Sequence, residues 1–369
     1  MSATETTAAT PPRLPQPAAA TPWVDIVINN YNYGRFLGAA IESALRQTYA
    51  GVTVIVVDDG SNDDSREVIA AYGDRIVAVL KENGGQASAF NAGLAASHGD
   101  VVLFLDADDV LVPDAAERVA AAFAARPGLA KVHFRLSVVD ESGTPTGELK
   151  PSTHIRLPEG DLTAATLRFP FDLARPATSG NAFSRSVLRA IAPIRDCGER
   201  IGADWYVVHL AALYGPVAAI DDPLARYRLH GGNLHERPDG SLDLDQVRAT
   251  IGFTAVTRTY LEERAERLGL AHDRRDASMS EIADRAISLK LDPTRHPIAA
   301  DTLPRLVRSG VRAAARRFDI AAPMKALFSI WLVVFCLAPR RLARPLAELF
   351  VMPARRAALN GLLRRMSGK

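Results

Sequence analysis

The chain has 369 residues, 48% of them hydrophobic and 23% charged, which excludes a chain disordered over its whole length and a collagen-like one. Two cysteines, Cys197 and Cys336, are too few for a disulfide framework or a zinc cluster, so a reducing compartment is expected. Residues 303–369 carry 14 Lys and Arg against two acidic residues, whereas the rest carries 30 against 40. This basic tail predicts contact with nucleic acid or an anionic membrane surface.

Residues 1–22 are rich in Ala, Thr and Pro and lack a basic start and an apolar run, so a disordered leader is expected. Short β-branched runs then alternate with longer Ala-rich stretches. The predicted strands are Asp25–Asn29, Val52–Asp58, Ile76–Lys81, Val101–Asp106 and Val132–Val138. The predicted helices are Phe36–Gln47, Ser65–Tyr72, Gln86–Ser97 and Pro113–Ala125. This alternation predicts a mostly parallel α/β sheet that binds ligands beyond the carboxyl ends of its strands.

The first three predicted strands end in polar loops. The first loop, residues 29–34, lacks a glycine-rich turn, which disfavours a dinucleotide oxidoreductase. The second begins at Asp58 and Asp59, residues as typical of a turn with a helix cap as of carboxylates that bind a nucleotide base or ribose. The third contains Asn83 and Gly84, which allow close approach of a ligand but also form ordinary turns.

The strongest local feature is the acidic cluster that closes the fourth predicted strand. Asp106, Asp108 and Asp109 follow five apolar residues directly. Such carboxylates repel one another unless a positive group lies between them, although three acids on a solvated loop remain an alternative. Alternation along a strand would place Asp106 and Asp108 on one side, where they suit Mg²⁺ or Mn²⁺ shared with substrate phosphates.

Two further positions are candidates for chemistry. Asp204 lies near the start of a predicted helix, where it is either a capping residue or a general base for an incoming hydroxyl. His230 follows Tyr227-Arg228 and precedes a Gly-Gly turn. A histidine beside arginine in such a turn is suited to holding phosphate or metal.

Taken in order, these segments resemble the family 2 glycosyltransferases, which have the glycosyltransferase A fold, a mostly parallel Rossmann-like sheet flanked by helices. The resemblance covers about residues 23–235, and it depends on the order and spacing of the segments more than on any one of them. The matching stretches are residues 24–32, Val56-Val57-Asp58-Asp59-Gly60-Ser61, Asn83-Gly84-Gly85 with Ala89-Phe90-Asn91-Ala92-Gly93, and Gly99-Asp100 through Asp109.

The resemblance implies a role for each matching residue. Tyr31 and Asp59 would contact the nucleotide base, with Asp58, Asn83 and Gly84 in the same donor pocket. Asp106 and Asp108 would form the DxD site for metal and diphosphate, and His230 would approach the metal or diphosphate. Asp204 would be the catalytic base, although Ala203 stands where the family commonly has an acid. The sequence also departs from the family at Asn29-Asn30, where Pro and a small residue are common.

The function implied is an inverting glycosyltransferase that uses Mg²⁺ or Mn²⁺ and a nucleotide-sugar donor, with a UDP-sugar expected. A lipid-linked glycan or an envelope polysaccharide is the expected acceptor. Two alternatives remain: a metal-dependent nucleotidyltransferase, disfavoured because the first loop lacks a glycine-rich basic turn, and a non-catalytic membrane-bound scaffold, disfavoured because Asp106, Asp108 and Asp204 are intact.

The basic tail predicts membrane association. Leu303, Val307, Val311, Ala314 and Phe318 fall on one helical stripe and Arg305, Arg308, Arg312 and Arg316 on the opposite one. The apolar run at 326–338 has 13 residues, too few to cross a bilayer, so attachment in the membrane plane or as a re-entrant segment is expected, with burial against the catalytic domain as the alternative. Because the aromatic residues do not alternate with the arginines, nucleic acid is disfavoured.

The expected domains are a leader over residues 1–22, a catalytic domain over 23–240, a helical extension over 241–300 and a membrane-associating basic tail over 301–369. The expected location is the cytoplasm, at the inner face of the membrane.

Overall fold

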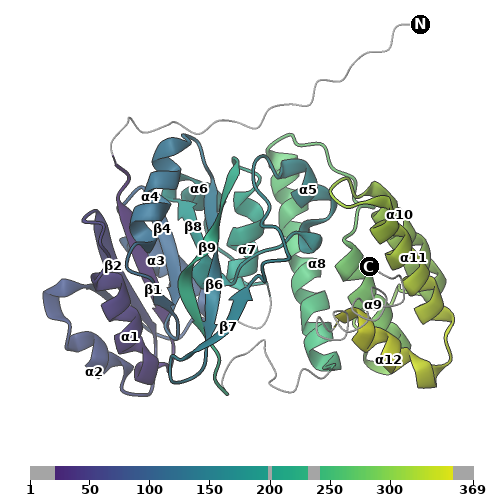
Figure 1. Ribbon diagram of the computed structural model, residues 1–369, viewed down its shortest axis with the longest axis horizontal. Coiled ribbons are helices and arrows are strands. Elements are labelled where there is room, and N and C mark those ends of the chain that lie inside the picture. Colours follow the sequence, from purple (N-terminus) through teal and green to yellow (C-terminus); the bar gives the residue numbers. More distant parts are fainter. Residues whose placement is uncertain (1–20, 198–201, 232–241, 352–369) are drawn as a thin grey trace, which may run out of the picture. The chain divides into compact units, whose positions relative to one another are not determined.

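The computed structural model describes residues 21–197, 202–231 and 242–351 (Figure 1). Most of the predicted leader, residues 1–20, lies outside the described residues. The chain divides into two compact units. The first comprises residues up to 167, 173–231 and 256–272, and the second comprises residues 168–172, 232–255 and 273–369. The four-part domain division stays a prediction.

Within its described residues, the first unit contains the five strands and four helices predicted from the sequence, to within a few residues, together with four further strands that the sequence did not predict. Its strands are β1 (Val24–Asn30), β2 (Val52–Asp59), β3 (Val77–Lys81), β4 (Val101–Asp106), β5 (Val110–Leu111), β6 (Lys131–Val139), β7 (Pro145–Lys150), β8 (Asn181–Ser184) and β9 (Val217–Arg228). Its helices are α1 (Gly34–Leu45), α2 (Ser65–Ala70), α3 (Gln86–Ala96), α4 (Ala115–Ala125), α6 (Arg185–Ile191) and α7 (Ala203–Ala211), with most of α5 (Thr163–Arg168).

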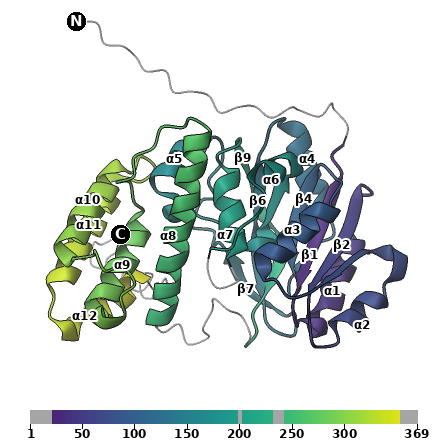
Figure 2. The same cartoon turned by 180° about the vertical axis from the view of Figure 1, so that it is seen from behind.

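The sheet has the strand order β3-β2-β1-β4-β8-β6-β9-β5, with β7 paired to β6. The four strands at one end, β3, β2, β1 and β4, are parallel, whereas β8 runs antiparallel to both β4 and β6. The central strands β1 and β4 are almost continuously buried, as expected for a sheet covered on both faces, whereas the edge strand β3 is largely exposed. Helices α1 and α3 contact β1 and β2, which confirms the α/β layers predicted from the sequence (Figure 2).

The second unit is helical. It contains the first part of α8 (Leu244–Arg267) and the whole of α9 (Met279–Leu291), α10 (Leu303–Arg316), α11 (Ala322–Leu337) and α12 (Arg340–Val351). Residues from α9, α10, α11 and α12 share one core, which includes Ile282, Leu306, Leu332 and Ala343. A Cβ atom at Gly310 would lie 2.3 Å from a methyl carbon of Leu332, so glycine permits the close approach of α10 to α11.

The packing of α10 confirms part of the stripe predicted for it. Leu303, Val307 and Ala314 contribute to the core of the second unit, whereas Val311 and Phe318 are 41% and 58% exposed. Leu306, Gly310 and Ala313, which the predicted stripe did not include, are also buried. Arg312 and Arg316 both pair with Asp273, at 3.1 and 2.9 Å, so they are part of the unit's own ion pairs. The apolar face of α10 is therefore largely covered by protein. Within the described residues, no helix is long and apolar enough to span a bilayer.

Candidate functional site

The parallel register brings the polar loops to one edge of the sheet. Asn30 pairs with Asp58, Asp59 pairs with Lys81, and Asn29 pairs with Asp106. The loops after β1, β2, β3 and β4 therefore begin side by side, as the sequence predicts for the carboxyl ends of parallel strands.

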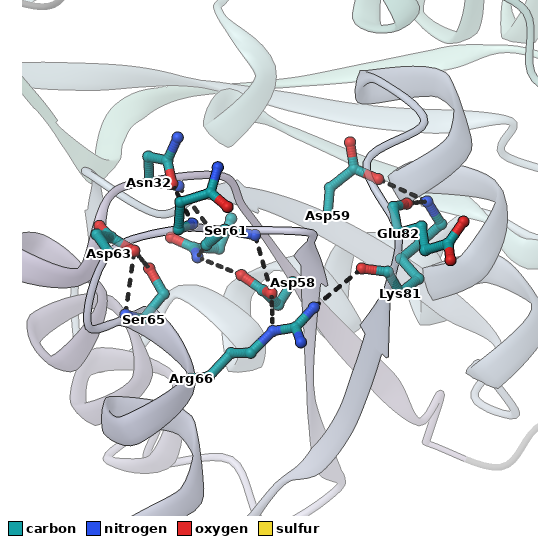
Figure 3. A network of polar contacts seen from close by, with 11 residues as sticks. Asn32, Asp58, Asp59, Ser61, Asp63, Ser65, Arg66, Lys81 and Glu82 are labelled. Atoms are coloured by element: carbon teal, nitrogen blue, oxygen red, sulfur yellow. Dashed lines mark hydrogen bonds and ion pairs between the residues drawn. The ribbon is translucent and has the colours of Figure 1, made fainter.

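Hydrogen bonds join the loop after β1 to the loop after β2 (Figure 3). The Asn30 amide donates to the carboxylate of Asp58, at 3.0 Å, and to the hydroxyl of Ser61, at 3.1 Å. The backbone N–H of Asn32 donates to the same hydroxyl, at 2.9 Å. Asn30 thus holds the two loops together.

Asp58 supports this network from inside. Its side chain is fully buried and accepts a 2.9 Å charge-assisted hydrogen bond from Nε of Arg66. Burial alone would raise the pKa of Asp58, but hydrogen bonds from Ser61, Arg66 and Asn30 outweigh burial and lower it. The ionised carboxylate therefore stabilises the fold of the loops.

The variant Asp58→Asn is expected to lower the free energy of unfolding by about 2 to 3 kcal/mol at pH 7, because it removes charged hydrogen bonds and leaves buried donors poorly paired. Since the folded state lowers the pKa, this stabilisation exists above a pH of about 4 and is lost as the pH falls through the folded value. Urea unfolding at pH 7 and at about pH 3 measures both effects. Asp222→Asn, which breaks an exposed ion pair with Arg118, is the matched control. An equal loss of stability at both pH values would contradict the role given to the charge.

Asp59 binds the loop after β3 through its carboxylate. Its carboxylate lies 2.6 Å from Nζ of Lys81 and accepts hydrogen bonds from the backbone N–H groups of Gly84, at 3.0 Å, and Gly85, at 2.7 Å (Figure 3 shows the lysine contact). Gly60 has a φ of +78°, and a Cβ atom there would lie 2.5 Å from the backbone nitrogen of Asn83. These contacts bring Asp59, Asn83 and Gly84 together. Tyr31 lies at the same edge and is 44% exposed.

The acidic cluster begins where β4 ends. Because the strand stops at Asp106, strand alternation does not extend to Asp108, and that part of the sequence argument was wrong. A turn closed by the hydrogen bond from the Asp109 N–H to the Asp106 carbonyl, at 3.0 Å, carries Asp108 instead. Ser179, in the short helical turn Thr178–Gly180, accepts a hydrogen bond from the N–H of Asp106.

The carboxylates of this cluster are close enough to repel one another. Burial, and after it the charges of Asp108 and Asp109, raise the pKa of Asp106 well above its ordinary value. The charge of Asp204, on another element, raises the same pKa further. The same charges act on Tyr33: burial, and after it the charges of Asp108 and Asp106, raise the pKa of Tyr33 to about 12. The structure thus brings Asp204 near the acidic cluster.

Asp108 and Asp109 have different partners. The carboxylate of Asp108 accepts a 3.0 Å hydrogen bond from Nε2 of His230, and the His230 ring lies against Tyr33 and Phe36. Asp109 is buried and accepts a 3.0 Å hydrogen bond from the backbone N–H of Arg228, the last residue of β9. His230 therefore lies beside Asp108 in the acidic cluster, whereas Asp109 binds the end of β9. Sequence reasoning did not assign functions to Tyr33 or Arg228.

Asp204 lies in the first turn of α7, and Gln86 holds the start of that helix. The Gln86 side-chain oxygen accepts hydrogen bonds from the N–H groups of Gly202, at 2.9 Å, and Ala203, at 3.0 Å. Gln86 is the first residue of α3, which follows the loop held by Asp59. The Gln86 side chain thus links the loop after β3 to the helix that carries Asp204. No local feature of the sequence indicated this role.

The carboxylate oxygens of the acidic cluster are ligands that suit a hard divalent cation. Within the described ranges, no three His, Cys, Asp or Glu side chains form a ready metal-binding group. Mg²⁺ is usually held by one or two carboxylates together with substrate phosphates, however, and Asp106 and Asp108 supply such a pair. Both side-chain polar atoms of Asn29, which pairs with Asp106 across the strands, are buried and lack a hydrogen-bond partner. These residues fit a ligand that arrives at the end of β4.

A recess of about 340 Å³ lies at the opposite edge of the sheet, lined by residues that include Val52, Thr53 and Val77, near the amino ends of β2 and β3. It contains no predicted site residue.

Comparison with known proteins gives the same fold. The crystal structure of S. aureus TarS residues 1–349 in complex with UDP matches with a TM-score of 0.52 at 13% identity, over 89% of this chain and 90% of that one. The chain therefore has the glycosyltransferase A type of fold.

Sequence comparison shows the family. The glycosyl transferase family 2 profile matches residues 25–191. An uncharacterized glycosyltransferase of Nostoc sp. is 34% identical over 250 residues, 67% of this chain and 76% of that protein. One from Rickettsia prowazekii is 42% identical over 97 residues, 26% of this chain and 30% of that protein. The chain belongs to glycosyltransferase family 2, which confirms the resemblance drawn from the sequence.

Proposed function

We propose that this glycosyltransferase moves a sugar from a nucleoside diphosphate to an acceptor hydroxyl in one displacement that inverts the anomeric configuration. The observation that supports this most is the position of the helix that carries Asp204. Gln86, directly after the loop held by Asp59, binds the start of that helix, and the charge of Asp204 acts on Asp106. A base on the acceptor side and a carboxylate pair on the diphosphate side are the groups that a single displacement requires, without a covalent enzyme intermediate.

The donor would lie along the carboxyl edge of the sheet. Tyr31 and Asp59 contact the base, and Asp58, Asn83 and Gly84 hold the surrounding loops. At the other end of the donor, Asp106 and Asp108 would hold Mg²⁺ or Mn²⁺, and His230 would approach the diphosphate. When bound, the cation supplies positive charge that offsets the charge on the leaving diphosphate. UDP, present in the related TarS complex, is the nucleotide that we propose.

Asp204 would act on the acceptor. The acceptor oxygen forms a bond to the anomeric carbon while the bond from that carbon to the diphosphate oxygen breaks, and the electron pair leaves with the diphosphate. The carboxylate of Asp204 takes the proton of the acceptor hydroxyl. Gln86 positions Asp204 by holding the first turn of α7.

The acceptor that we propose is a lipid-linked glycan or an envelope polysaccharide, met at the inner face of the membrane. The strongly basic C-terminal region supports this choice, because such a region is attracted to anionic lipid.

The proposed function is tested with the purified full chain, Mn²⁺ and a panel of nucleotide sugars. Thermal shift identifies the donor that stabilises the protein, and NMR of the product gives the configuration at the new linkage. A β-linked product from an α-linked donor is expected, with release of nucleoside diphosphate. Retention of configuration, or release of pyrophosphate as in a nucleotidyltransferase, would overturn the proposal.

A further inference from the structure

Exposed apolar side chains gather on one segment of the second unit. Thirteen large hydrophobic residues are exposed in the described part of the chain, and eight of them lie between residues 311 and 342. Five belong to α11 and form an apolar stripe at helical spacing. The members of this α11 stripe are Met324, Leu327, Ile330, Val334 and Leu337, which are 48% to 80% exposed.

The other face of α11 is occupied by protein. Phe328, Leu332 and Phe335 are buried in the core that α11 shares with α9, α10 and α12. The helix carries one charged residue, Lys325, and its Nζ donates to the backbone carbonyl of Arg317. The α11 stripe is thus an uncharged surface on a helix that is anchored from behind.

The charges around the α11 stripe are positive. Arg340 and Arg341 follow it directly in the chain, and both are exposed, as are Arg344 on α12 and Arg305 on α10. Residues 303–369 contain 14 basic residues against two acidic ones. A second copy of the chain would bring like charges together on this surface, and aliphatic side chains offer no stacking platform for nucleic acid. An anionic bilayer supplies both the apolar and the negative partner.

We propose that the α11 stripe is a membrane-docking surface that lies in the interface of an anionic bilayer, with the neighbouring arginines on the lipid headgroups. At 1.5 Å per residue, the 16 residues of α11 measure about 24 Å, shorter than the roughly 30 Å hydrocarbon core, so the helix lies along the interface. This deepens the proposed function and rests on it for the membrane-bound acceptor. The sequence predicted membrane contact for both the stripe at 303–318 and the apolar run at 326–338, and we assign the contact to the second of these, which lies in α11.

The test is flotation of the full chain with vesicles of phosphatidylcholine, with or without about one third phosphatidylglycerol. The wild type is expected to float with anionic vesicles. Leu327→Gln/Ile330→Gln should lower the bound-to-free ratio at least about tenfold, because it removes apolar contact without changing charge. Val77→Gln/Ile155→Gln, at positions 43% and 41% exposed elsewhere, is the matched control and should float like the wild type.

A charge arm tests the arginines. Arg340→Gln/Arg341→Gln should weaken flotation on anionic vesicles, and more so at low salt, whereas Arg126→Gln/Arg156→Gln, at exposed arginines of the first unit, should not. Equal flotation of the wild type and the stripe variant would overturn the proposal. A second outcome would also overturn it: neither protein binds vesicles, the wild type is a dimer, and the stripe variant is a monomer. A second copy of the chain would then cover the stripe. Flotation needs no donor, so a chain that transfers sugar to a soluble acceptor without floating overturns this inference alone.

Discussion

Asp204→Asn is expected to reduce kcat for sugar transfer by about 10²- to 10⁴-fold, the usual contribution of a positioned general base. The amide keeps the shape and the place of the carboxylate in the first turn of α7 but cannot take the acceptor proton. Because Asp204 is not placed among the residues that hold the base or the diphosphate, the affinity for nucleoside diphosphate should change little. Steady-state kinetics and calorimetric titration of the nucleotide measure the two quantities.

The alternative role of Asp204 is stabilisation of α7 through the helix dipole, worth about 0.3 to 1 kcal/mol. That role predicts a lower melting temperature with unchanged turnover. Asp114→Asn, at the exposed N-cap of α4, is the matched control, since it removes a carboxylate from a helix start outside the site. Unchanged turnover in Asp204→Asn would remove Asp204 from the base role.

The second large effect is expected for Asp108→Asn. We expect a loss of about 10²- to 10³-fold in kcat, the scale seen when one group that stabilises transition-state charge is removed. The proposed cation site also predicts that Mn²⁺ increases the affinity of the wild type for nucleoside diphosphate and that the variant lacks this increase. Nucleotide titrations with and without Mn²⁺ give this readout without turnover.

Asp109→Asn separates this effect from a general disturbance of the acidic cluster. Asp109 accepts the backbone N–H of Arg228, so its replacement should lower the melting temperature while Mn²⁺ still increases nucleotide affinity. If Asp108→Asn kept its Mn²⁺-dependent affinity, the cation would not be held by that residue.

The loops after the parallel strands were predictable because their geometry is local. Each strand is a short apolar run, and parallel pairing places all the strand ends at one edge whatever the rest of the chain does. Asp59 and Asp106 could therefore be assigned to one edge from the sequence. The side of the strand on which Asp108 lies could not, because β4 stops two residues earlier and a turn sets its direction.

Contacts between distant segments had no local signal. The oxygen of Gln86 meets the N–H groups of Gly202 and Ala203 more than 100 residues away, and Asn30 meets Asp58 across neighbouring strands. Nothing in the sequence indicated which groups Gln86 and Asn30 bind, so only the packing of their elements shows it.

For this protein, the sequence by itself determined the first alternating strands and helices, the acidic loops at one sheet edge and the family, because apolar periodicity and motif spacing are properties of the chain. The tertiary structure decided that Asp204 is close enough for its charge to act on Asp106, and which side of α11 is buried and which is exposed. An amphipathic pattern predicts that a helix has an apolar face, but which neighbour covers that face depends on how the helices pack.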